Sequence, residues 1–340
     1  MANDSLDEGT FSLSKGRRKY GTVYGAASFY AAAQNRVTIS PMSPLMSFWK
    51  AWLLAARPRT LAASIVPVLV GGALAFARGR FDLLLCAATL AVALLLQIGS
   101  NFANDVFDFL KGADVARRGP TRVTQSGLLS PHQMLVSTGA IFALAAVLGL
   151  YLVLSAGWPL VIAGGLAILS ALAYTGGPWP LGYHGLGDVF VFIFFGLVGV
   201  AGSYYVQAHE LTPQALVAAI PVGLLITNIL VVNNLRDIES DRAAHKRTLA
   251  VRIGVSATRS QFTLFVYAAY VVPPLMAIAG LAGDWFWLPW LSVPLALKLV
   301  REAQSASEGA QFPGLLVHTV RLNLVYGVLF ALSFVLSKAT

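Results

Sequence analysis

Nine long apolar segments dominate this sequence and restrict it to one class of fold. A helix of about 20 apolar residues crosses a bilayer, and only helices or closed barrels satisfy the backbone there. The segments are too long and too evenly apolar for barrel strands, in which apolar and polar residues alternate. The sequence therefore predicts an all-α polytopic membrane protein with nine transmembrane helices. Their approximate spans are 60–78, 83–104, 134–155, 158–175, 188–207, 214–235, 260–282, 285–300 and 319–337.

Composition and charge agree with this class. Only 11% of the residues are charged and 57% are hydrophobic, whereas soluble domains carry roughly a quarter charged residues. With the N-terminus in the cytoplasm, only Arg78, Arg80 and Lys338 of the 24 Lys and Arg residues fall on the other side of the membrane. The positive-inside rule then predicts a cytoplasmic N-terminus and an external C-terminus. Membrane topology explains the net charge of +9, so no nucleic acid partner is expected.

The first 45 residues differ from the rest of the chain. They are polar, include a basic cluster at 15–19, and contain no long apolar run such as a signal peptide has. They are predicted to form a disordered cytoplasmic tail, residues 1–45, ahead of a membrane domain, residues 46–340. Two alternatives stay open, a translation start at Met42 or Met46 and a transit peptide.

Two polar segments repeat one pattern of amide and carboxylate side chains at the cytoplasmic ends of predicted helices. Spacings of three and four residues place such side chains on one helical face. The members are Asn101, Asp105 and Asp108 in the first segment, and Asn233, Asp237 and Asp241 in the second. Carboxylates one turn apart repel each other, and a hard cation with oxygen ligands would compensate them. We therefore predict these six residues as Mg²⁺ ligands.

The alternative for each segment is a solvated helix end whose acids pair with nearby basic residues. Two matched faces on one side of the membrane, in a chain with only 15 acidic residues, favour a ligand site. Basic side chains next to the segments would contact a diphosphate or balance the acids. They are Arg57, Lys111, Arg117, Arg122, Lys246 and Arg247. Charge that follows the positive-inside rule is the alternative for each of them.

Five ordered stretches resemble the UbiA superfamily of intramembrane prenyltransferases. The resemblance is closest to the 1,4-dihydroxy-2-naphthoate polyprenyltransferases of menaquinone synthesis, and it extends over about residues 50–335. The stretches are 56–61, 101–114, 119–127, 174–183 and 233–252. One position departs from the broad superfamily, because Gly112 stands where an Asp is common and an Asp follows at Asp114 instead.

The resemblance implies a nine-helix bundle around a central cavity, capped on the cytoplasmic side by the two motif-bearing loops. It implies that Mg²⁺ and four catalytic aspartates, Asp105, Asp108, Asp237 and Asp241, activate a polyprenyl diphosphate. It also implies that the chain is attached to 1,4-dihydroxy-2-naphthoate with loss of CO₂, giving demethylmenaquinone and diphosphate. The expected substrate-binding residues are Arg57, Asn101, Asn104, Lys111, Arg122, Tyr174, Asn233, Lys246 and Arg247.

Two alternatives to this function stay open. Another aromatic acceptor, such as 4-hydroxybenzoate or homogentisate, would use the same diphosphate site. A membrane transporter is the alternative from another class, but transporter sites lie near mid-membrane, whereas these acids lie at helix ends. The expected location is a bacterial cytoplasmic (inner) membrane, with membrane lipid around the bundle. Prenyl length and oligomeric state are not predicted.

Overall fold

Helices form all the regular secondary structure of the described residues. The computed structural model describes residues 44–114, 121–307 and 311–337, which belong to one unit, Met42–Thr340. The predicted tail lies outside the described residues except for its last two positions. The predicted all-α class is therefore confirmed for the described part of the chain, and the tail stays a prediction.

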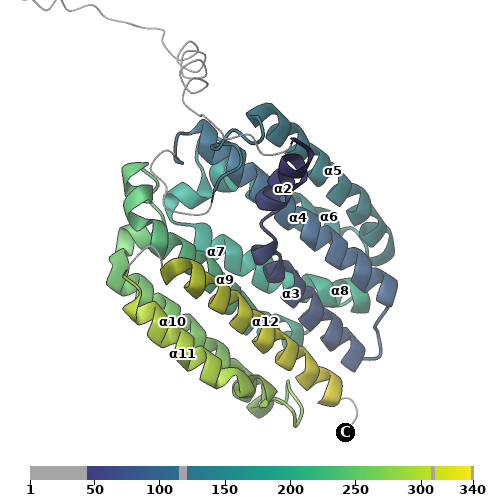
Figure 1. The fold of residues 1–340 in the computed structure, drawn as a ribbon. Coiled ribbons are helices and arrows are strands. Elements are labelled where there is room, and N and C mark those ends of the chain that lie inside the picture. The colour runs from purple at the N-terminus through teal and green to yellow at the C-terminus, as the bar shows by residue number, and fades with distance from the viewer. Residues whose placement is uncertain (1–43, 115–120, 308–310, 338–340) are drawn as a thin grey trace, which may run out of the picture. The chain divides into compact units, whose positions relative to one another are not determined.

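The helices follow the order of the predicted apolar segments (Figure 1). Their bounds are α2 (Pro44–Ala56), α3 (Pro58–Ala77), α4 (Leu83–Leu110), α5 (Pro131–Ala156), α6 (Pro159–Thr175), η1 (Leu181–His184), α7 (Gly187–Val191), η2 (Phe192–Ala201), α8 (Gly202–Ala208), α9 (Pro213–Ala243), α10 (Leu249–Ile278), η3 (Leu288–Ser292), α11 (Val293–Ser305) and α12 (Phe312–Ser337).

Seven helices in the described part are long and apolar enough to cross a membrane. They are α3, α4, α5, the continuous run Gly187–Ala208, α9, α10 and α12. The two other predicted segments also overlap helices. One is α6, which has 17 residues, and the other is the η3–α11 region, which Pro289 and Pro294 interrupt. The count of nine spans therefore stays a prediction.

Local sequence explains where several helices begin. Ser130 and Gln133 form a reciprocal capping box at the start of α5. The hydroxyl of Thr212 accepts a hydrogen bond from the Ala215 amide at the start of α9. These side chains satisfy amide groups that a helix start leaves without partners. Each of these two helices also has proline at its first position, where the missing N–H costs nothing.

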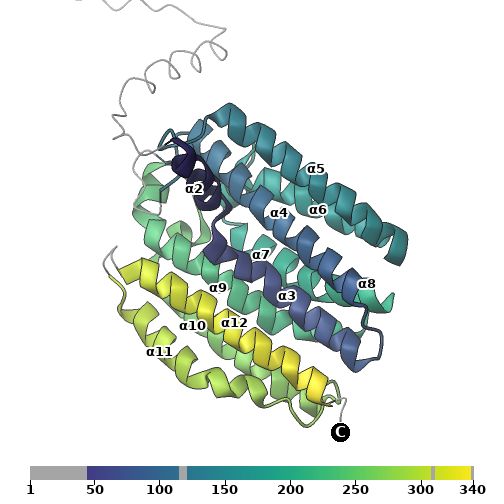
Figure 2. The ribbon, with the colours of Figure 1, turned by 45° about the vertical axis from the view of Figure 1, so that its right-hand side comes forward.

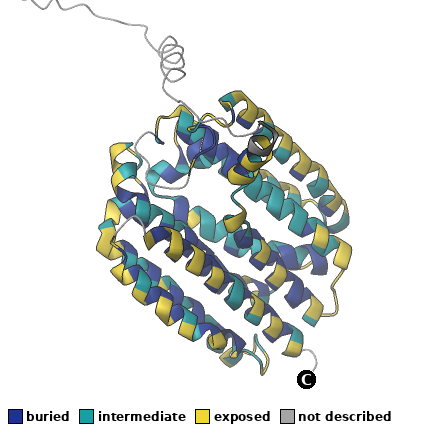
Figure 3. Cartoon of the chain, viewed as in Figure 1, coloured by how far each residue is buried: buried dark blue, intermediate teal, exposed yellow. Residues whose placement is uncertain are grey.

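The helices pack side by side, and α9 and α3 lie in the interior. Both ribbon views place α5 and α6 at one end of the bundle and α10 and α11 at the other, with α3, α9 and α12 between them (Figures 1 and 2). Helix α3 packs on α12, α9 packs on α10 and η2, and α4 packs on α5 and α6. Figure 3 shows the buried residues concentrated on the inner helices α3, α9 and α12. The largest cluster of buried apolar side chains comes from α3, α8 to α12 and η2.

Helix α2 precedes the first predicted apolar segment and was not predicted. It ends at Ala56, and α3 begins at Pro58. Between them Arg57 has φ 51° and ψ 66°, in the left-handed region, which interrupts the helix before Pro58. The Asn101 side-chain amide donates to the Ala56 carbonyl oxygen at 3.0 Å. The first motif therefore also fixes the break between these two helices.

Two adjacent glycines on α3 test the close packing of this helix. A Cβ at Gly71 would lie 2.5 Å from the Val200 carbonyl oxygen and 2.9 Å from the Tyr204 amide nitrogen, both backbone atoms. We expect Gly71→Ala to lower the stability by about 1–3 kcal/mol, the usual cost of overpacking. A Cβ at Gly72 would make only ordinary van der Waals contacts, with Cys86 Sγ at 3.5 Å and Phe81 Cε2 at 3.5 Å. Gly72→Ala, the matched control, should be neutral or slightly stabilising. Thermal unfolding in detergent measures both, and equal melting temperatures would contradict the packing.

Candidate active site

The two motifs lie in the last turns of α4 and α9, which both continue beyond their apolar parts. On α4, Asn101, Asp105 and Asp108 are only 4%, 1% and 2% exposed. Charged side chains are almost never fully buried unless they are paired. The structure therefore excludes a solvated helix end for the first motif and confirms that its three side chains share a buried face.

Asp105 holds a loop over the end of α4. Its carboxylate accepts hydrogen bonds from the backbone amides of Val123 at 3.2 Å and Thr124 at 2.9 Å. Two backbone donors satisfy the oxygen atoms of this buried carboxylate and fix its orientation. The segment after residue 120 is thereby fixed beside the motif, and it places Arg122 within reach of the next aspartate.

Asp108 joins four separate parts of the chain. Its Oδ2 accepts a hydrogen bond from Arg122 Nη2 at 2.9 Å and lies 3.5 Å from Lys246 Nζ. Its Oδ1 accepts a hydrogen bond from the Tyr183 hydroxyl at 2.9 Å. These partners come from the loop after α4, from η1, and from the connection between α9 and α10. The ends of α4 and α9 are therefore linked through one carboxylate.

Tyr183 supports this junction through its ring as well as its hydroxyl. The Nζ atoms of Lys111 and Lys246 lie 5.1 and 5.2 Å from the ring centroid, a distance at which the ring face attracts a cation. Burial and then the negative charge of Asp108 raise the pKa of Tyr183 well above its usual value. The hydroxyl therefore stays protonated and remains a hydrogen-bond donor. The Arg247 amide also donates to the Tyr183 carbonyl oxygen.

Arg122 is the buried cation of the site. Burial by itself would lower the pKa of its guanidinium, but the carboxylates around it raise that pKa. They are, in order of effect, Asp108, Asp114, Asp105 and Asp237, so acids from both motif-bearing helices act on it. Its Nη1 is buried and has no hydrogen-bond partner among the described residues. This nitrogen is a donor that an anionic ligand could use.

The second motif is more open than the first. Arg236 forms a bidentate pair with Asp237, with both contacts at 2.7 Å. Asp241 is half-buried, and its carbonyl oxygen accepts a hydrogen bond from the Lys246 amide at 2.8 Å. Asn233 donates to the Ile229 carbonyl oxygen within α9. Asp237 is itself buried at 7% exposure, so Asp241 is the more accessible acid of the second motif.

A pocket of about 580 Å³ opens beside the second motif. Four of its lining residues carry a positive charge, and none is acidic. The lining residues are Arg242, His245, Lys246, Arg247, Val251 and Arg252. Planar guanidinium groups and Lys side chains are the usual protein ligands of phosphate groups. The pocket therefore suits an anion. Because Lys246 lines the pocket and also lies 3.5 Å from Asp108, a bound anion would be next to the Asp108 junction.

The remaining predicted residues occupy the rim of this site. The Thr175 hydroxyl donates to Asn104 at 3.0 Å, and Lys111 Nζ donates to the Gly177 carbonyl oxygen at 3.0 Å. The ring of Tyr174 packs closely against Gly182 and Gly187. The prediction for Arg117 lies outside the described residues.

Sequence reasoning missed two polar residues in and near the site. Tyr183 lies in the stretch 174–183 that resembles the family, but nothing in its sequence spacing indicated a contact with Asp108. Asp188, at the start of α7, is buried, and its Oδ2 accepts a hydrogen bond from Gln261 Nε2 at 2.9 Å. A single acid at the start of an apolar run was the only sign of it.

The donor set fits Mg²⁺ that arrives with a phosphate ligand better than a metal cage made by the protein alone. Within the described part of the chain, no three His, Cys, Asp or Glu residues are grouped closely enough to hold a metal by themselves. Both motifs nevertheless offer oxygen ligands. Mg²⁺ commonly binds one or two carboxylates and completes its octahedron with water and substrate phosphates. The two helix ends match that requirement.

Arg122→Gln tests the buried ion pairs. We expect a loss of about 3–5 kcal/mol of stability, because removal of one partner leaves buried charges without compensation. Arg80→Gln is the matched control, since Arg80 is exposed and distant from both motifs in sequence. Thermal unfolding of both variants without ligand measures the difference. A change no larger than that of the control would contradict the assignment of Arg122 to the buried network.

Comparisons with known proteins identify the family of this chain. The model of the "UbiA prenyltransferase family" matches residues 64–310. A 1,4-dihydroxy-2-naphthoate octaprenyltransferase of Escherichia coli strain K12 is 39% identical over 296 residues, which cover 85% of this chain and 96% of that protein. The protein of the same name from Mycobacterium tuberculosis is also 39% identical, over 84% of this chain and 97% of its own length.

A solved structure shows the same fold at lower identity. A UbiA homologue from Archaeoglobus fulgidus bound to GPP and Mg²⁺ superposes with a TM-score of 0.57 at 13% identity, covering 83% of this chain and 99% of that one. The matched family model spans most of the chain and both motifs, and its members' fold agrees with the helical bundle described above. The chain is therefore an integral membrane protein that belongs to the UbiA prenyltransferase family.

Proposed function

We propose that this protein transfers a polyprenyl chain from its allylic diphosphate to 1,4-dihydroxy-2-naphthoate, with loss of the ring carboxylate as CO₂. The products are demethylmenaquinol, the reduced form of demethylmenaquinone, together with CO₂ and diphosphate. The observation that carries the proposal is the junction at Asp108, which joins both motif-bearing helix ends beside a basic pocket. The names of the relatives from Escherichia coli and Mycobacterium tuberculosis support the choice of acceptor.

The diphosphate lies between the two motifs. Lys246 and Arg247 from the pocket, Lys111 on the rim, and the free Nη1 of Arg122 bind its oxygens. When bound, Mg²⁺ neutralises charge on the departing diphosphate, as metal ions do for phosphate leaving groups. Asp105, Asp108, Asp237 and Asp241 would hold it, together with the side-chain oxygens of Asn101 and Asn233. These fixed charges stabilise the negative charge that develops on the leaving group.

The prenyl chain extends into the bundle. Apolar side chains along α4, α6 and η2 are only half-buried although these helices belong to the bundle, as at Leu94, Leu96, Ile168 and Phe194. We place the prenyl chain against these partly exposed apolar side chains, and the solved UbiA homologue of the same fold that is bound to GPP supports a prenyl site in this fold. An apolar cavity also excludes water from the allylic cation, which water would otherwise capture.

The acceptor binds near Tyr174, where α6 ends close to Asp108. The Tyr174 ring packs against Gly182 and Gly187, so the loop that follows α6 forms part of the acceptor wall. Arg57 or Arg122 holds the ring carboxylate. The ring carbon attacks the allylic carbon, the C–O bond to diphosphate breaks, and the C–C bond to the carboxylate releases CO₂.

The proposed membrane topology of the protein rests on the distribution of its Lys and Arg residues. The bundle has nine spans in a bacterial cytoplasmic membrane, and the N-terminus and both motifs face the cytoplasm. The C-terminus lies outside. The two motif-bearing loops cap the cavity on the cytoplasmic side, and residues 1–45 form a tail outside the membrane domain. The excess of Lys and Arg near the motifs supports this orientation.

A product assay tests the proposed function. The full chain in nanodiscs receives an all-trans polyprenyl diphosphate, Mg²⁺ and either 1,4-dihydroxy-2-naphthoate or 4-hydroxybenzoate. We expect prenylated, decarboxylated naphthoquinol, recovered as the quinone after oxidation in air, and a loss of kcat/KM of about 100-fold or more in Asp108→Asn, because loss of a group that stabilises the leaving group has effects of this size. EDTA should abolish the product. Asp284→Asn, at an exposed acid between α10 and η3, is the matched control.

Three outcomes would contradict parts of the proposal. Product from 4-hydroxybenzoate alone would replace the acceptor and keep the chemistry. Full activity of Asp108→Asn would remove the junction from the mechanism. No product with any aromatic acceptor from folded protein would contradict prenyl transfer and favour the transport alternative.

A further inference from the structure

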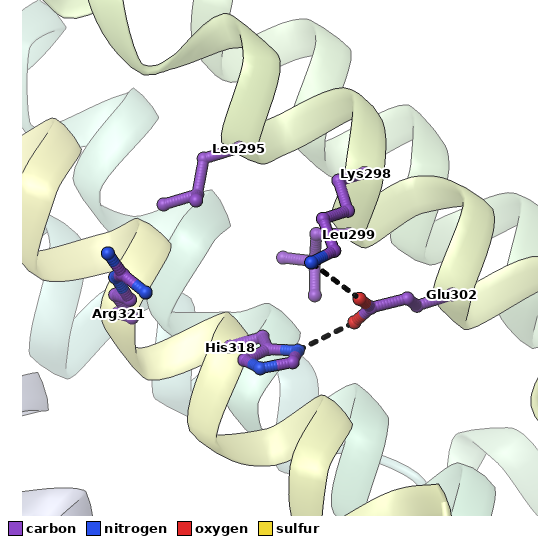
Figure 4. Close-up of a pocket in the computed structure, with 6 residues that line it drawn as sticks. All are labelled: Leu295, Lys298, Leu299, Glu302, His318 and Arg321. Atoms are coloured by element: carbon purple, nitrogen blue, oxygen red, sulfur yellow. Dashed lines mark hydrogen bonds and ion pairs between the residues drawn. The ribbon is translucent and has the colours of Figure 1, made fainter.

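A second charged pocket lies between α11 and α12, in a region that the proposed reaction does not use. It has a volume of about 40 Å³, room for a small polar group. Figure 4 shows Glu302 between Lys298 and His318, with Arg321 further along α12. The lining residues are Leu295, Lys298, Leu299, Glu302, His318 and Arg321.

Positive charge exceeds negative charge in this pocket. Glu302 is its one acid, and it lies 2.7 Å from His318 Nδ1 and 4.0 Å from Lys298 Nζ. Arg321 has no ion pair within the described part of the chain. The Lys298 side chain is 72% exposed, so a ligand from outside can reach it. One carboxylate cannot compensate two permanent cations, and an anion would complete the balance.

The pocket lies where the apolar part of each helix begins. After Arg321, α12 contains no charged residue up to Ser337. That stretch of α12 is about 24 Å long at 1.5 Å per residue, which is most of a hydrocarbon core of about 30 Å. The η3–α11 region is likewise uncharged from Leu288 until Lys298. The pocket is therefore at the level of the lipid head groups.

Exposed apolar side chains continue from the pocket along both helices. Leu291 precedes Lys298 by seven residues and is exposed, and Val328 and Leu332 follow Arg321 by seven and eleven residues and are exposed. On α12 the spacings of seven and eleven residues return to the same face, and Leu291 lies in η3, directly before α11. Arg321 thus stands at the head of an apolar track that faces outward, as an acyl chain below a phosphate requires, and Leu291 adds exposed apolar surface before Lys298.

We propose that this pocket binds an anionic membrane phospholipid. Its phosphate pairs with Lys298 and Arg321, and its acyl chains follow Leu291, Val328 and Leu332. Basic pockets between membrane helices on the cytoplasmic side are a recognised form of site for anionic head groups. Glu302 is the one acid of the pocket and limits its net positive charge. The site is independent of the proposed prenyl transfer.

Lipid titration of the purified full chain in detergent tests this proposal. Phosphatidylglycerol with two oleoyl chains is the probe, and phosphatidylcholine with the same chains and inorganic phosphate are the comparison ligands. Native mass spectrometry counts retained lipid, and thermal unfolding measures stabilisation. We expect phosphatidylglycerol to be retained and stabilising, with phosphatidylcholine and inorganic phosphate at least tenfold weaker.

Three variants separate a binding role from a structural one. Lys298→Gln with Arg321→Gln should weaken phosphatidylglycerol binding at least tenfold, whereas Glu302→Gln should leave it unchanged or strengthen it. Arg301→Gln, the matched control on α11 outside the pocket lining, should bind within twofold of wild type. Equal retention of both lipids by wild type, equal stabilisation by inorganic phosphate, or weaker binding by Glu302→Gln would overturn the proposal. The lipid comparison on wild type and the binding by Glu302→Gln can each overturn the proposal. The proposal therefore stays testable even if the double variant fails to fold.

Discussion

The buried carboxylate of Asp108 is the contact on which the candidate site depends. A charge removed from water is costly unless it is paired and hydrogen-bonded. Asp108 meets that requirement only when Arg122, Tyr183 and Lys246 all converge on it. These residues belong to three different connections between helices, so one carboxylate determines how the chain closes over the ends of α4 and α9. The fold and the site are therefore stabilised by the same interactions.

The same arrangement prepares the site for an anion. The cations on the α9–α10 connection outnumber its acids, and Arg122 keeps a buried donor without a partner in the described structure. The acids of both motifs would repel a diphosphate if they stood alone, so a hard cation between them and the phosphate oxygens resolves the repulsion. Asp241 is half-buried, whereas Asp105, Asp108 and Asp237 are buried. The first motif thus anchors the site, and Asp241 of the second motif remains the most accessible of the four aspartates.

Sequence predicted the parts of this protein that depend on local spacing. The apolar spans gave the helices, and the repeated three- and four-residue spacing placed Asp105 and Asp108 on one face of α4. It did not predict α2, whose position depends on the bond from Asn101 to Ala56. Nor did it predict the contact of Tyr183 with Asp108, which joins residues 75 positions apart. Such contacts arise from the packing of distant segments, which no short pattern records.

The central claim is that both motifs form one diphosphate site, and a double-mutant cycle on ligand binding tests it most directly. The measurement is the Mg²⁺-dependent affinity of a non-hydrolysable prenyl thiodiphosphate for wild type, Asp108→Asn, Asp241→Asn and the double variant. Residues that share one ligand network show non-additive effects. We predict that each single variant loses at least about tenfold in affinity and that the double variant loses little more. Independent losses that multiply in the double variant, or a loss confined to one motif, would contradict a shared site.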